Sequence, residues 1–76
     1  MGKYIISEFQ TNAEGVTAFV PPEQRDDRNE AESVFYLKLA YAATSNVPIH
    51  TVILDTNDGF RIDAKSYRHG EETQEE

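Results

Sequence analysis

The chain has 76 residues, no cysteine and a formal net charge of −7. A chain this short forms at most one domain and buries only about 60% of the surface that its unfolded form exposes. It has no thiol for a disulfide or a zinc site, and its 14 acidic against 7 basic side chains make it a poor match for the phosphate backbone of nucleic acids.

Part of the acidity lies in the C-terminal tail, since four of the 14 acidic residues fall in the last six positions. After Gly70 the chain is polar and has no apolar residue that could join a core, so we predict one domain over residues 1–69 and a disordered acidic tail over residues 70–76. Without the four acids of that tail the net charge is −3. A solvated, solubilising surface is the ordinary interpretation of such acidity, and an acidic surface that imitates DNA is the alternative.

The apolar runs are short. None approaches the roughly 20 residues of a membrane span, and the run after Lys3 ends too soon for a signal peptide. We therefore expect a soluble, cytoplasmic protein.

The first 25 residues predict a β-hairpin. Residues 4–10 and 16–20 are rich in β-branched and aromatic side chains, and residues 11–15 have the composition of a turn. Because proline supplies no hydrogen for strand pairing, we expect Pro21-Pro22 to end the second strand and the polar residues 23–26 to form a loop.

A single helix is predicted over residues 27–45. Asp27 followed by Glu30 resembles a capping box, in which the first side chain accepts a hydrogen bond from an unpaired backbone N–H. At the other end Asn46 can adopt the left-handed conformation that terminates helices, and Pro48 prevents continuation.

Apolar residues recur along this helix with the spacing of a face that packs on a core. Lys38 falls inside the apolar face, and we expect its methylene groups to cover the edge of the core while its amine stays in water. The predicted core-facing residues are Ala31, Val34, Phe35, Leu39, Tyr41 and Ala42.

A second hairpin is predicted after the helix. Residues 48–55 form a strand, and residues 56–59 suit a type I turn closed by glycine. The register that fits this turn places Leu54 opposite Ile62, apolar against apolar. A two-residue turn would place Leu54 opposite Asp63, which is a worse match.

These elements predict an α+β fold with the order β-β-α-β-β. The two hairpins form one antiparallel four-stranded sheet, and the helix packs on one face of it. The strand order remains open.

No motif for catalysis, a cofactor or a metal is present. His50 is interpreted as a partly buried, hydrogen-bonded residue at a strand end, and His69 as solvated. Asp58 suits the turn, and Asp63 can pair with Lys65 or Arg61. The serines have no glycine elbow, and no glycine-rich phosphate loop exists. We expect no catalytic residue, no cofactor and no metal.

One feature points to a contact surface. The side of the helix opposite the core-facing one should be polar but is partly apolar, and the second sheet face also keeps apolar residues. Single exposed apolar residues are normal, whereas a connected set suggests self-association or a partner. The predicted protein-interaction residues are Tyr36, Leu37, Ala40, Ala43, Ile49 and Ile53.

Parts of the chain resemble short uncharacterised proteins encoded in prophage and gut-bacterial phage genomes, often among structural or tail genes. The resemblance lies in residues 30–33, 39–45, 47–52, 59–60 and 66–70, about half of the chain. The resemblance assigns no activity to any single residue. It implies a small accessory protein that takes part in phage assembly or in a protein–protein contact. If the protein is phage-encoded, it would be associated with the virion.

The function expected from the sequence is a non-enzymatic structural or protein-interaction protein that self-associates, as a homodimer for example. The alternative is an acidic inhibitor or regulator that binds a host protein. An enzyme that acts through aspartate and histidine residues is the third possibility.

Overall fold

A computed structural model describes residues 3–69, so the tail predicted over residues 70–76 lies outside the described part. The predicted α+β class and the order β-β-α-β-β are confirmed. The elements are β1 (Tyr4–Thr11), β2 (Thr17–Arg25), α1 (Arg28–Ala43), β3 (Ile49–Thr56) and β4 (Arg61–Arg68).

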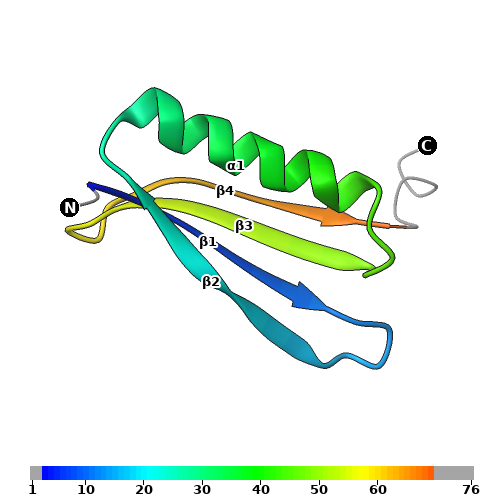
Figure 1. The fold of residues 1–76 in the computed structure, drawn as a ribbon. Helices are drawn as coiled ribbons and strands as arrows, with labels where there is room; N and C mark the ends of the chain where they lie inside the picture. Colours follow the sequence, from blue (N-terminus) through cyan, green and yellow to red (C-terminus); the bar gives the residue numbers. More distant parts are fainter. Residues whose placement is uncertain (1–2, 70–76) are drawn as a thin grey trace.

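The strands form one four-stranded antiparallel sheet in the order β2-β1-β3-β4. The first strand of each hairpin is therefore central, and β1 pairs with β3 from Tyr4–Thr56 to Thr11–Ile49. The helix links the edge strand β2 to the central strand β3 and lies across one face of the sheet (Figure 1). No helix among residues 3–69 is long and apolar enough to cross a membrane.

The two central strands bury alternate residues beneath the helix. This period of two arises because successive side chains of a strand point to opposite faces. Ile6, Val52 and Leu54 pack with Ala31 and Phe35 of the helix to form the core. The positions between them on β1 and β3 therefore face away from α1.

Both ends of the helix have caps. The Asp27 carboxylate accepts a hydrogen bond from the Glu30 backbone N–H at 3.1 Å, which confirms the predicted start. The end differs from the prediction, because Thr44 is the C-terminal cap and no non-glycine residue among those described has a positive φ. Asn46 is therefore not left-handed.

The core-facing side of the helix is confirmed except at one residue. Ala31, Phe35 and Ala42 are buried, and Val34 and Leu39 are partly buried.

Tyr41 was predicted to be in the core, but 65% of its surface is exposed. Its side chain lies on the flank of α1 that faces β2, where it lines an open groove between the two elements.

The second strand continues through the two prolines, contrary to prediction. β2 runs to Arg25, and its pairing with β1 shifts between Ile6–Glu23 and Glu8–Val20, around Pro21-Pro22. An edge strand pairs with a neighbour on one side only, and a bulge interrupts that pairing locally. A proline there can lack its N–H without breaking a hydrogen bond of the sheet. Consequently Glu23 and Arg25, predicted to lie in a loop, are strand residues.

The second turn matches the prediction. The Thr56 N–H donates to the Phe60 carbonyl at 2.8 Å, and the Gly59 N–H donates to the Thr56 carbonyl at 3.1 Å. Gly59 has φ +98°, a conformation that glycine adopts without a steric penalty.

Beyond the turn the predicted register is wrong. Asp55 pairs with Arg61, but Leu54 pairs with Asp63, because a bulge adds one residue to β4 between these pairs. The extra residue, Ile62, packs against the core. The bulge thus preserves the apolar contact that the predicted register was chosen to satisfy.

Phe35→Ala tests the core. Phe35 is 1% exposed and is the largest fully buried side chain, so its truncation should lower the free energy of unfolding by about 3–5 kcal/mol in urea denaturation. The neighbouring Tyr36→Ala is the control and should cost clearly less, because Tyr36 is half exposed and loses only its edge contact with the Phe35 ring. Equal losses would contradict this core.

Candidate functional site

The six predicted contact residues do not form one surface. Tyr36, Leu37, Ala40 and Ala43 are exposed on α1. The other two, at positions 49 and 53, alternate with the buried residues of β3 and so face the opposite side of the sheet. The structure therefore separates a helix surface from a sheet surface.

The sheet surface is an apolar patch on the face that α1 leaves uncovered, here called the open-face patch. Phe9 and Phe19 meet there across the β1–β2 pair with ring centroids 5.6 Å apart, and Phe19 is 78% exposed. Four of its residues, Ile5, Phe9, Phe19 and Ala64, were not predicted as contacts. The patch consists of Ile5, Phe9, Phe19, Ile49, Ile53 and Ala64.

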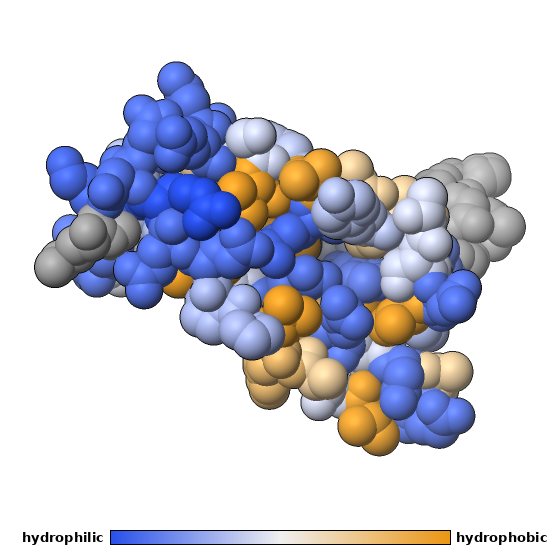
Figure 2. Space-filling model, viewed as in Figure 1, coloured by the Kyte–Doolittle hydropathy of each residue, from blue (hydrophilic) through white to orange (hydrophobic). Residues whose placement is uncertain are grey.

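The charged residues that the described strands place on this face are Asp55, Arg61 and Arg68. Among the described strand residues that face away from α1, the one with a carboxylate is Asp55. Its carboxylate oxygen lies 2.9 Å from Arg61 Nε. That carboxylate raises the pKa of the Arg61 guanidinium by a hydrogen bond and by its charge. The acidic residues lie elsewhere, and Figure 2 shows hydrophilic residues gathered at the end of the molecule where α1 begins.

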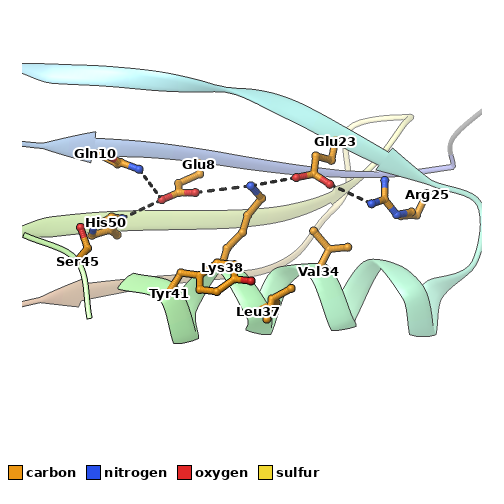
Figure 3. A pocket seen from close by; sticks show the side chains of 10 residues that line it. All are labelled: Glu8, Gln10, Glu23, Arg25, Val34, Leu37, Lys38, Tyr41, Ser45 and His50. Atoms are coloured by element: carbon orange, nitrogen blue, oxygen red, sulfur yellow. Dashed lines mark hydrogen bonds and ion pairs between the residues drawn. The ribbon is translucent and has the colours of Figure 1, made fainter. Parts of the chain in front are cut away.

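On the other face, a groove of about 400 Å³ lies between α1 and the strands β1 and β2. It exists because α1 packs over the central strands and leaves part of β2 uncovered (Figure 1). Charged side chains occupy its floor, and apolar side chains of α1 form one wall (Figure 3). The groove is lined by Glu8, Gln10, Glu23, Arg25, Val34, Leu37, Lys38, Tyr41, Ser45 and His50.

Glu8 is the centre of the charged cluster. Its carboxylate is 8% exposed, and it lies 2.8 Å from His50 Nδ1, 3.0 Å from Gln10 Nε2 and 3.6 Å from Lys38 Nζ. Glu8 occupies the same face of β1 as the core residue Ile6. A carboxylate at a core-facing position was the signal in the sequence that the prediction missed.

Lys38 joins this centre to β2. Its Nζ lies 3.2 Å from Glu23, whose other oxygen lies 3.0 Å from Arg25 (Figure 3). Lys38 was expected to place its amine in water, but its side chain is only 12% exposed. The reason is that β2 extends far enough to bring Glu23 over the amine.

His50 was predicted to be hydrogen-bonded and partly buried. Its side chain is hydrogen-bonded and fully buried, with Nδ1 directed at Glu8. An ionised carboxylate only accepts hydrogen bonds, so Nδ1 carries the proton when Glu8 is ionised. The other ring nitrogen, Nε2, is buried and has no hydrogen-bond partner among the described residues.

His69 was predicted to be solvated, but it is partly buried and hydrogen-bonded. Its ring nitrogen Nε2 lies 2.7 Å from the Ala42 carbonyl, and its backbone N–H donates to the Pro48 carbonyl at 2.8 Å. An imidazole N–H at this position adds a hydrogen bond to a helix-end carbonyl that also accepts from the Ser45 backbone N–H at 3.2 Å. In the described part of the chain, no three acidic or histidine side chains converge as metal ligands.

The remaining aspartates have local partners. Asp58 lies in the turn, as predicted. It accepts a hydrogen bond from the Thr56 hydroxyl, and this bond lowers the pKa of the Asp58 carboxyl. Asp63 lies 3.8 Å from Lys65, one of the two predicted partners. Neither aspartate belongs to the groove.

Comparison with known proteins assigns no role to these residues. No family model matches the chain, and no curated protein or solved structure shows a significant match.

The charged cluster predicts a dependence of stability on pH. The hydrogen bond from Lys38 is the main cause that lowers the pKa of the Glu23 carboxyl in the folded state. A lowered pKa stabilises the fold above the unfolded value of about 4.3, and this stabilisation is lost as the pH falls through the folded value. We expect Glu23→Gln to lose less stability than the wild type between pH 6 and pH 3 in urea denaturation, by a small margin because the side chain is 39% exposed.

Lys38→Met provides the matched test. It removes the same bond from the other side, together with the contact between Lys38 and Glu8, so the double variant should change the pH dependence by less than the sum of the two single effects. An unchanged acid profile in Glu23→Gln would contradict the role given to this pair.

Proposed function

We propose that this is a non-enzymatic interaction protein that self-associates, with a second copy of the chain covering the open face of the sheet. The observation that carries the proposal is a set of four apolar side chains that the two central strands place on this face, among polar ones. Ile5 and Phe9 on β1, with Ile49 and Ile53 on β3, are only partly buried by their own neighbours. Antiparallel sheets that face water on one side usually place polar residues there.

The distribution of charge favours a second copy as the occupant. Two molecules with a net charge of −7 each repel one another over most of their surfaces. On the open face the carboxylate of Asp55 is paired with Arg61, and the other charged residue there is the basic Arg68, so the acidic groups repel one another least at this face. A basic partner would find no acidic cluster on this face to bind.

The available area fits a weak dimer. Strands of eight residues extend about 26 Å and four strands span about 19 Å, so the face has a planar area of about 500 Å². Two copies would bury about 1,000 Å² in total, which is the lower limit for a specific interface. We therefore expect a reversible dimer rather than an obligate one.

Two sheets can pack in this way with known geometry. Face-to-face sheets lie about 10 Å apart with their strands rotated by about 30°, and a twofold axis would bring the same patch of each copy together. Phe19 would then fill space between the sheets, since its ring already leans on Phe9.

The resemblance to phage-encoded proteins suggests where such a contact would act. We propose an accessory role in phage assembly, in which dimer formation presents two copies of the helix surface to other components. The proposed locations are the host cytoplasm and, if the protein remains bound, the virion.

Phe19→Lys and Ile53→Thr test the interface. Each variant introduces a charge or a hydroxyl into the open-face patch, so each should raise the dimer dissociation constant by at least about tenfold. Sedimentation velocity from about 1 μM to 1 mM measures the constant. Urea denaturation at low concentration should show that the monomer remains folded, because both side chains lie outside the core.

The control is Tyr36→Lys on the helix surface, which should leave the dissociation constant unchanged. A wild-type chain that stays monomeric at the highest concentration would overturn the proposal. If Tyr36→Lys alone dissociated the dimer, the interface would lie on α1 and not on the open face.

A further inference from the structure

We infer that the two copies of the proposed dimer meet about a twofold axis that runs parallel to the strands, so that β1 of each copy lies over β3 of the other. Large apolar side chains of one face then enter hollows above the smaller polar side chains of the second face. This inference rests on the proposed dimer and specifies which residues of the two faces are in contact.

The open face of the two central strands has an alternating pattern. Every cross-strand pair on this face joins a larger apolar residue to a smaller polar one, and the apolar member alternates between β1 and β3 from one pair to the next. The face is therefore a chequered surface of raised and hollow positions. The pairs are Ile5–Asp55, Ser7–Ile53, Phe9–Thr51 and Thr11–Ile49.

Two identical chequered faces fit together when a raised position of one lies over a hollow position of the other. An axis parallel to the strands exchanges β1 with β3 and keeps the position along the strand. Phe9 then lies over Thr51 of the second copy, and Ile53 lies over its Ser7. These four positions are at the centre of the β1–β3 ladder, where the rotation of about 30° between packed sheets displaces side chains least.

The hydroxyl groups at the hollow positions have partners in their own sheet. Thr51 Oγ1 lies 3.3 Å from Ser66 Oγ on β4, and Thr11 Oγ1 lies 3.0 Å from Thr17 Oγ1 on β2. A hydroxyl that keeps a hydrogen bond costs less to bury than one that loses its water without replacement. Ser66 also extends the hollow at Thr51 to the edge strand, where the ring of Phe19 would lie over it.

The basic residues of β4 favour this axis over an axis that runs across the strands. The pattern would also fit about the latter, which lays each strand over its own copy with the direction reversed. Arg68 would then face Arg61 of the second copy twice, and Asp55 balances only one guanidinium group of each facing pair. About the parallel axis β4 lies over β2, whose paired residues on the open face are uncharged. Those residues are Thr17, Phe19 and Gln24.

Exchange of the two central residues tests the fit. Phe9→Thr removes a raised side chain and Thr51→Phe fills a hollow, so each variant alone should raise the dimer dissociation constant at least about tenfold. The double variant Phe9→Thr/Thr51→Phe exchanges the large and the small member of one pair, which still face each other about the parallel axis. Its dissociation constant in sedimentation velocity should return to within about threefold of the wild-type value.

The matched control is Thr51→Ile/Ile53→Thr, which exchanges a large and a small residue along β3. About the parallel axis this variant should raise the dissociation constant at least about tenfold, because it sets large side chains over one another at positions 9 and 51. About the axis across the strands the control would dimerise normally and the exchange of Phe9 with Thr51 would not. That reversed outcome would overturn the inference and leave the proposed dimer intact.

Cross-linking decides the question if the exchange variant does not fold. The chain has no cysteine, so introduced thiols report only the chosen positions. On oxidation, a mixture of Phe9→Cys and Thr51→Cys should form the mixed disulfide faster than a mixture of Phe9→Cys and Ser7→Cys. Equal rates or the reverse order would overturn the inference.

The wild-type chain separates this inference from the proposed function. A wild type that stays monomeric at millimolar concentration overturns the proposed dimer, and the inference with it. A wild-type dimer that no variant of Phe9 or Thr51 affects would have its interface elsewhere, which also overturns both.

Discussion

The structure depends on a mismatch of width between one helix and four strands. A helix with its side chains is about 10 Å across, whereas four paired strands span about 19 Å. Along the strands the lengths agree, since the 16 residues of α1 extend about 24 Å and eight-residue strands about 26 Å. One helix therefore covers the central strands, and the chain has no second helix within residues 3–69 to cover the edge strand β2 or the far face. The groove and the open-face patch both exist because one helix does not cover the whole sheet.

The charged cluster occupies the boundary that the mismatch creates. Beneath the axis of α1 the core is apolar, but toward β2 the sheet becomes accessible. At this boundary the core-facing position of β1 holds Glu8 in place of an aliphatic residue. Lys38 bridges the boundary because its long side chain leaves the helix near the core and ends between Glu8 and Glu23. Ion pairs of this kind add little net stability compared with apolar packing, yet they penalise any shift of α1 that would separate them. The cluster thus links α1 to β1, β2 and β3 through side-chain contacts.

The sequence predicted the elements because their signals are local. The period of the apolar residues in α1, the Asp27 cap and the Asn57-Asp58-Gly59 turn act within a few residues of one another. The errors concern properties set by distant partners. Pro21-Pro22 could remain in a strand only because β2 is an edge, and the bulge at Ile62 arose because the core accepted its side chain. The groove could not be predicted from spacing, since Glu8, Lys38 and His50 come from three different elements.

The two edges of the sheet explain why its face is the better candidate for assembly. An open edge invites pairing with another strand, and proteins block such edges with proline, bulges and charges. Here β2 carries Pro21-Pro22 with its bulge, and β4 carries alternating charges at Arg61, Asp63 and Lys65. Pairing of two copies through either edge is thus discouraged, whereas the open face has no such protection. Burial of that face would also stabilise a domain with a small core, because an interaction made only by folded chains shifts the folding equilibrium in proportion to the logarithm of their concentration. In this fold, association and stability would therefore be coupled through the same uncovered residues.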